Sequence, residues 1–273
     1  MLLLHLKKYI HLKPNINMKT YFQVLLRLLS LLIIFVACSK TESTPDPVGT
    51  ATTSNYATIM QNAFKDYGAA NVTVAVDGNF LTVTTTTVPD HKSPYFAGTD
   101  SRFENYNGTN TAFKKAPNTI TEGKTTLRIP TNPTKATSAQ ATPMGPFGVS
   151  LNGVPFFNQY AAGGSPLTGE INGFDQYGGH PQQQGQYHYH VEPLYITAKK
   201  GKGALLGFLL DGFPVYGPLE NSKTIKSSDL DAYHGHSHAT TEYPNGIYHY
   251  HITADDPYIN GSGFYGTPGT LTK

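Results

Sequence analysis

Between residues 56 and 84 the spacing of apolar side chains changes from that of a helix to that of strands. Apolar residues first recur every three or four positions, as on one face of an α-helix; they are Tyr56, Ile59, Met60, Ala63, Phe64 and Tyr67. Ser54 is placed to cap this helix and Gly68 to end it. Residues 72–76 and 80–84 are rich in Val and Thr and flank Asp77-Gly78, which predicts a β-hairpin.

Residues 97–143 are rich in Thr, Asn and Pro and contain few apolar clusters. This composition predicts loops and short edge strands.

The N-terminal residues 1–37 have the pattern of a signal sequence that begins at Met18. A basic residue precedes the apolar stretch 24–36, which is shorter than the roughly 20 residues needed to span a bilayer. Residues 35–38 resemble a bacterial lipoprotein signal, in which Cys38 is lipidated and becomes the new N-terminus; an ordinary cleaved signal is the alternative. We therefore expect a flexible tether over 38–55 and a lipid anchor that attaches the protein to a membrane of the bacterial cell envelope. The outer membrane and the cell surface are the candidate locations, and the sequence does not choose between them.

Composition favours a β-rich extracellular protein. The 273 residues include 18 Tyr, 14 Phe and no Trp, and only 14% are charged, which excludes a coiled coil and a mainly disordered chain. Five of the 20 basic residues and none of the 18 acidic ones lie in residues 1–37, so the net charge of +2 becomes −3 after cleavage. A nucleic-acid partner is not supported. Because Cys38 is the single cysteine, thiolates are excluded as metal ligands of the domain.

The second half of the chain contains an internal duplication, with copies at about 148–190 and 207–251. Residues 148–157 match 207–216, each with a Leu-Asn/Asp-Gly-x-Pro unit, and Phe174-Asp175 matches Leu230-Asp231. Each copy ends in Gly-x-Tyr-His-Tyr-His. The three offsets are 59, 56 and 61 residues, so the order of the motifs is kept while the loops vary. The Asn-Gly and Asp-Gly pairs predict tight turns between strands.

The histidines of the duplicated motifs are typical metal ligands. Side chains two apart on a strand share a face, so the two histidines of each tetrapeptide point one way and the tyrosines the other. A third histidine from each Gly-His loop would complete three nitrogen ligands. The predicted ligands are His180, His188, His190, His236, His249 and His251. Either two three-histidine clusters or one joint site satisfies this pattern, and imidazoles without thiolate suit a divalent transition metal, foremost Cu or Zn.

Other residues are weaker candidates for the same site. Asp175, Asp231, Asp211 and Glu192 could accept hydrogen bonds from the ligand imidazoles or supply a carboxylate ligand, and His91 follows a strand. His234 and His238 flank His236 and could capture metal without being designed for it. The competing structural interpretation is a Tyr/His ladder that only holds two strands together. Motifs of phosphate loops, serine hydrolases and zincin proteases are absent from the sequence.

The Gly-Gly-His unit, the two Tyr-His-Tyr-His tetrapeptides and residues 210–217 together resemble the YHYH-domain proteins over roughly 72–267. The resemblance implies a secreted or surface-associated protein and carries no established activity. It also implies cysteines near Tyr177, Tyr233 and Ser262, which this chain lacks.

These observations predict one mainly β domain over 56–273. We expect a duplicated antiparallel β core, of sandwich or barrel type with the copies facing each other, and one short N-terminal helix. The leading functional prediction is a cell-envelope lipoprotein with a histidine-rich transition-metal site. A metal-dependent oxidoreductase or hydrolase, and a metal-free scaffold or ligand-binding domain, remain alternatives; the protein or small-molecule partner stays undefined.

Overall fold

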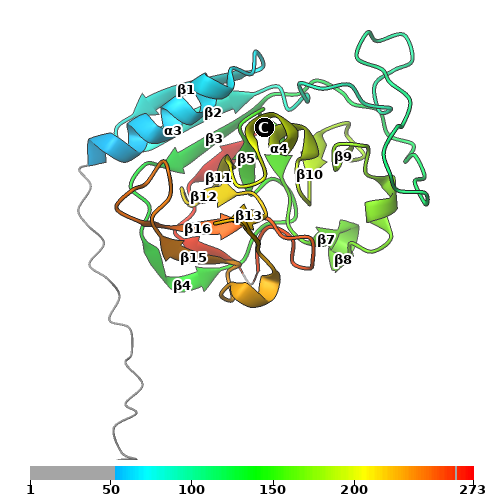
Figure 1. Cartoon of the computed structure of the whole chain (residues 1–273). Helices are drawn as coiled ribbons and strands as arrows, with labels where there is room; N and C mark the ends of the chain where they lie inside the picture. Colours follow the sequence, from blue (N-terminus) through cyan, green and yellow to red (C-terminus); the bar gives the residue numbers. More distant parts are fainter. Residues whose placement is uncertain (1–52, 262) are drawn as a thin grey trace, which may run out of the picture. The chain divides into compact units, whose positions relative to one another are not determined.

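The computed structural model describes residues 53–261 and 263–273 (Figure 1). The first element is helix α3 (Thr53–Tyr67), which ends at Gly68 as predicted, with Gly68 at φ 75°. Its apolar stripe is buried at Met60, Phe64 and Tyr67. The helix begins at Thr53, so Ser54 lies within its first turn rather than at the cap, and the last residues of the expected tether are helical. The signal sequence, Cys38 and the rest of the tether lie outside the described residues.

Helix α3 runs along a four-stranded sheet (Figure 1), and its Phe64 ring also contacts Phe208 in a second sheet, with 5.9 Å between the ring centroids. The predicted hairpin is confirmed as strands β1 and β2, and Gly78 in its turn has φ 57°. The strands of this sheet, in spatial order, are β1 (Val72–Asp77), β2 (Phe80–Thr85), β3 (Thr125–Pro130) and β18 (Thr270–Thr272).

Strand β3 corrects the expectation of loops and edge strands over 97–143. It is paired on both sides and buries Leu127 and Ile129 completely. Alternate positions of β3 face the core, and Thr126 and Arg128 separate them on the opposite face.

The core is an eight-stranded sheet that contains both copies of the duplication. The first copy provides β5, β6, β10 and β9, and the second provides β11, β12, β16 and β15. Their spatial order is β15 (Gly235–His238), β16 (Ile247–His251), β12 (Pro214–Tyr216), β11 (Leu205–Leu209), β5 (Gly148–Ser150), β6 (Pro155–Phe156), β10 (Tyr187–Tyr189) and β9 (Gly179–Pro181).

The two halves of this sheet repeat one another strand by strand. In each copy a hairpin is followed by a parallel pair and then an antiparallel pair, so β6/β10 corresponds to β12/β16 and β10/β9 to β16/β15. The copies meet where β5 pairs antiparallel with β11. They therefore lie side by side in one sheet rather than facing each other. The mainly β, duplicated core is confirmed; it includes two parallel pairs, and the described residues form no closed barrel.

The Asn-Gly and Asp-Gly units form the hairpin turns, as predicted. Gly153 and Gly212 have φ of 83° and 89°, and each turn docks against the four-stranded sheet. The hydroxyl of Thr85 donates to the carbonyl of Gly153 at 2.8 Å. A Cβ on Gly212 would lie 2.4 Å from the carbonyl oxygen of Pro130.

The remaining elements connect these sheets. A second helix, α4 (Leu194–Lys200), leads from the first copy to the second and was not expected from the sequence. Three two-stranded ribbons pair β4 (Lys135–Gln140) with β17 (Phe264–Gly266), β7 (Tyr160–Ala161) with β8 (Ser165–Pro166), and β13 (Leu219–Glu220) with β14 (Lys223–Thr224). Single 3₁₀ turns span Ala162–Gly164, Glu170–Gly173 and Ser227–Asp229. Among the described residues no helix is long and apolar enough to cross a bilayer.

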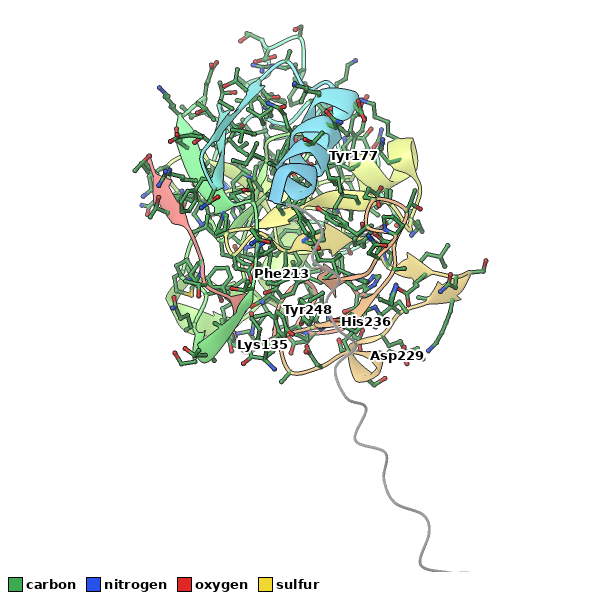
Figure 2. All side chains as sticks on the ribbon, turned by 90° about the vertical axis from the view of Figure 1, so that its left-hand side faces the viewer. Lys135, Tyr177, Phe213, Asp229, His236 and Tyr248 are labelled. Atoms are coloured by element: carbon green, nitrogen blue, oxygen red, sulfur yellow. The ribbon has the colours of Figure 1, made fainter. Side chains whose placement is uncertain are left out.

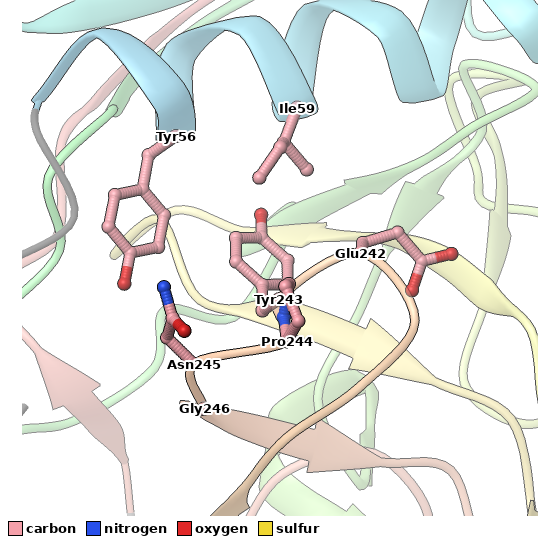
Figure 3. Close-up of a pocket in the computed structure, with 7 residues that line it drawn as sticks. All are labelled: Tyr56, Ile59, Glu242, Tyr243, Pro244, Asn245 and Gly246. Carbon is pink, nitrogen blue, oxygen red and sulfur yellow. The ribbon is translucent and has the colours of Figure 1, made fainter. Parts of the chain in front are cut away.

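Helix α3 also contacts the loop before β16 (Figure 3). Tyr56 stacks on Tyr243 with 5.4 Å between ring centroids. The pocket between them has a volume of about 10 Å³, which is room for one water molecule at most. This contact is packing between elements rather than a binding site.

Candidate metal centres

Two groups of histidine and glutamate side chains converge at opposite ends of the eight-stranded sheet. Site A consists of Glu170, His180, His188 and His190, and site B of Glu220, His236, His238, His249 and His251. Within each site one donor atom per residue lies within 4.8 Å of all the others. Two ligands at about 2.1 Å from one ion are at most about 4.2 Å apart. Small side-chain movements would therefore bring each complete set onto a single ion.

Strand alternation builds both sites, as expected from the sequence. His188 on β10 and His190 directly after it share one face, while Tyr187 and Tyr189 point to the other face and are completely buried. On β16 the same pattern separates His249 and His251 from the tyrosines. The Gly-His strands bring the third histidine opposite, because His180 is in register with His188 and His236 with His249.

Backbone carbonyls fix the orientation of the ligand rings. The Nδ1–H groups of His188 and His190 donate to the carbonyls of Gln186 and Asn158, at 3.2 and 2.5 Å. In site B, Nδ1–H of His249 donates to Ile247 at 3.0 Å and that of His251 to Gly217 at 2.8 Å. A carbonyl only accepts, so Nδ1 carries the proton and Nε2 is left with its lone pair. This is the tautomer that binds metal through Nε2.

The strand histidines are neutral at physiological pH. Burial lowers the pKa of His190 to about 4 and that of His249 to about 3. Burial, reinforced by the neighbouring imidazoles, also lowers the pKa of His188 well below its ordinary value. Neutral imidazole is the form that binds a metal, so these ligands need to release no proton at pH 7.

Within the described part of the chain the buried Nε2 of His249 has no hydrogen-bond partner, and those of His180 and His251 each face a glutamate oxygen. Nε2 of His188 lies 2.9 Å from Nε2 of His190, although both carry lone pairs. Facing lone pairs at this distance repel unless a cation lies between them.

Each site also contains a glutamate that the sequence analysis missed. Oε1 of Glu170 lies 2.9 Å from Nε2 of His180, and Oε1 of Glu220 lies 3.3 Å from Nε2 of both His236 and His251. Burial raises the pKa of each carboxyl, but the surrounding histidines lower it by more, so both carboxyls stay ionised.

The two glutamates occupy the same connection in the two copies. Glu170 opens the 3₁₀ turn between β6 and β9, and Glu220 ends β13 between β12 and β15. They are 50 residues apart, whereas the flanking motifs are 56–61 residues apart, so comparison of the copies does not align them. The sequence signal that could have identified these glutamates is that both copies have a carboxylate in the same connection.

His238, treated above as an incidental neighbour, belongs to site B. Its Nδ1–H donates to the carbonyl of Ala239 at 2.7 Å, and its Nε2 contacts Oε1 of Glu220. His234 lies outside site B, with Nε2 3.0 Å from the hydroxyl oxygen of Thr253.

The aspartates lie on the tyrosine face and orient no ligand imidazole. Asp175 accepts from the hydroxyl of Tyr187 at 2.8 Å, and Asp231 accepts from that of Tyr248 at 2.9 Å. Tyr248 and His236 are labelled in Figure 2. Both aspartates precede the Gly-His strand and also accept from backbone amides of their own loop. From the sequence these aspartates could have fixed the tautomers of the histidines, but backbone carbonyls accept from Nδ1 of the strand histidines instead.

The other candidates also lie outside both sites. Asp211 accepts from the hydroxyl of Tyr250 at 2.6 Å and is fully buried, which raises its pKa to about 6. His91 has Nε2 3.2 Å from the hydroxyl oxygen of Tyr189, on the tyrosine face. Glu192 pairs with Lys202 at 3.4 Å near the surface.

The sequence left open whether the histidines form one joint site or two clusters. Strands β12, β11, β5 and β6 separate the histidine strands β16 and β10, so each copy has its own group. The tyrosines hydrogen-bond to Asp175, Asp231, Asp211 and Asn152 rather than to the imidazoles of either site. A Tyr/His ladder is therefore not what the strands form.

These features define a class of protein: a β domain with an internal duplication that carries one His/Glu group per copy. The model of the YHYH protein family matches residues 126–228 and 219–263, and the chain belongs to this family. No curated protein and no solved structure matches the chain.

Proposed function

We propose that the protein binds transition-metal ions at two sites, one in each copy of the duplication. The observation that carries the proposal is the pair of Nε2 atoms of His188 and His190, 2.9 Å apart with both Nδ1 protons donated to carbonyls. Because burial keeps both rings neutral at pH 7, a metal cation is the partner that best fits between the lone pairs.

The donor sets support a divalent ion of borderline character. Imidazole nitrogens with one carboxylate and no thiolate suit Zn, Cu(II), Ni(II) and Fe(II). One carboxylate leaves a net positive charge on a bound divalent ion, and the carbonyls that hold Nδ1 increase the basicity of the ligands. The same arrangement in both copies favours a selected function over chance proximity.

Elemental analysis of the full chain, produced without a polyhistidine tag, tests the proposal. We expect two equivalents of metal per chain, and one equivalent after His188→Ala with His190→Ala or after His249→Ala with His251→Ala. His234→Gln is the matched control, because this buried histidine lies outside both sites, and it should retain both equivalents. A chain that binds no Zn, Cu, Ni or Fe would contradict the proposal, as would variants with unchanged metal content.

We also propose that the protein is a lipoprotein of the cell envelope, anchored through Cys38. The proposal is supported by residues 24–38, where an apolar stretch ends in Ala-Cys. Mass spectrometry of the purified protein would show an N-terminal Cys38 carrying acyl chains, and Cys38→Ser would lose them. An unmodified N-terminus elsewhere would contradict it.

A further inference from the structure

The two sites differ in the number of ligands because one strand position differs. Strand β15 carries His236 and, two residues later, His238, on the same side as the ligands of β16. In the first copy the position two residues after His180 is Gln182, whose side-chain amide donates to Gln186 at 3.3 Å. Site A therefore has four donors and site B five.

The aromatic cover over the two sites also differs. In site A, Phe157 stacks on His188 at 3.9 Å between ring centroids, and Phe174 lies parallel to His190 at 5.8 Å. The matching positions at site B are Tyr216 and Leu230. Tyr216 meets His249 edge-on at 5.1 Å, and a partly buried leucine, Leu230, stands where the first copy has its second aromatic ring.

Site B opens more fully onto a cleft. Glu220, His238, His249 and His251 line a cleft of about 430 Å³. The cleft beside site A, of about 620 Å³, is lined by Glu170 and His180 but by neither strand histidine. Two ligands of site B, His236 and His238, are also partly exposed, with 26% and 35% of their side chains accessible.

We propose that site A holds a four-coordinate ion saturated by the protein, whereas site B holds a six-coordinate ion whose last position faces the cleft and binds a small anion. This inference rests on the proposed metal binding. Four nitrogen and oxygen donors suit a tetrahedral ion such as Zn²⁺ in a closed site. Five donors leave one position of an octahedral ion open. A divalent ion with a single carboxylate keeps a positive charge, which favours an anion at that position.

Cobalt(II) is a suitable probe, because four-coordinate Co(II) absorbs visible light several-fold more strongly than six-coordinate Co(II). His249→Ala with His251→Ala leaves only site A, and His188→Ala with His190→Ala leaves only site B. We expect strong absorption that azide does not change from the first variant, and weak absorption that azide shifts from the second.

An exchange between the copies tests the inference with milder changes. His238→Gln gives site B the residue of site A, so its Co(II) absorption should rise several-fold and its response to azide should be lost. Gln182→His gives site A a fifth donor, and its absorption should fall.

Identical spectra at the two sites, or a response to azide at site A alone, would overturn this inference while leaving metal binding intact. Failure of the unmodified chain to bind cobalt or any of the other metals would overturn the proposed function as well.

Discussion

At the scale of single residues, backbone carbonyls hold the strand imidazoles in the tautomer that leaves the Nε2 lone pair free. His188, His190 and their counterparts follow from strand alternation, which is local in the chain. The acceptors of their Nδ1 protons include the carbonyls of Asn158 and Gly217, which are 32 and 34 residues away and carry no side-chain signature. Glu170 and Glu220 were not predicted for a related reason. Loops of different length bring them to their sites, so the two copies do not align at these residues.

The aspartates of the tyrosine face show how burial changes a residue's role. Asp211 accepts hydrogen bonds from Tyr250 at 2.6 Å and from the amide of Gly266 at 2.9 Å, yet burial raises its pKa to about 6. The equivalent residue of the first copy is Asn152, which donates to the hydroxyl oxygen of Tyr189 at 3.1 Å. At this position the second copy therefore has a residue that titrates, Asp211, and the first copy has one that does not, Asn152.

Asp211→Asn should therefore change the pH dependence of stability. The folded state holds a proton on Asp211 up to about pH 6, whereas the unfolded chain releases it near 3.8. The Asp211 contribution to the free energy of unfolding is thus greatest at low pH and is lost as pH rises through the folded pKa. Relative to the natural chain, the variant should gain about 1 kcal/mol between pH 5 and pH 7.5. Urea unfolding of metal-free protein measures this, and a difference independent of pH would contradict it.

At the scale of elements, the hairpins and the repeat order were accessible from the sequence, while the strand pairing was not. Turns such as Asn152-Gly153 and Asp211-Gly212 join neighbouring strands, so local chemistry predicts them. The parallel pairs β6/β10 and β12/β16 join strands about 30 residues apart, and nothing in either strand specifies that partner. Strand β3 was underestimated because Thr and Arg separate its buried residues.

The turn glycines also connect the two main sheets, which Gly212→Ala tests. Alanine there would adopt φ near 89° and place Cβ 2.4 Å from the carbonyl of Pro130 in β3. Backbone strain and overpacking together should cost about 3 kcal/mol of unfolding free energy. Gly78→Ala is the control, since φ is 57° and a Cβ meets nothing within 4 Å, so it should cost about 1 kcal/mol. Denaturant unfolding that gives equal losses would show that the contact with β3 does not matter.

At the scale of the molecule, the duplication makes two sites on one continuous sheet. The antiparallel pairing of β5 with β11 joins the copies, and Gly207 there allows the closest approach, because a Cβ would lie 2.2 Å from the carbonyl of Val149. The sites are built from opposite ends of the sheet and share no residue. Ions bound at the two proposed sites should therefore stabilise the fold independently, although both sites rest on the same core.

Metal removal should show this independence. A ligand at about 100 times its dissociation constant stabilises the folded state by about 2.7 kcal/mol, so a chelator should lower the thermal midpoint of the natural chain by the sum of the contributions of the two sites. Five strand spacings of about 4.8 Å separate the histidine strands, well beyond the range of about 10 Å within which effects couple. Each variant with one site removed should lose about half of the chelator effect, and the two halves should add to within about 0.5 kcal/mol. Differential scanning calorimetry measures the effect of the chelator on four proteins, which are the natural chain, the two single-site variants and the combined variant. If either single-site variant already showed no response to the chelator, the two groups would act as one linked centre, and the division of metal binding between the copies would be wrong.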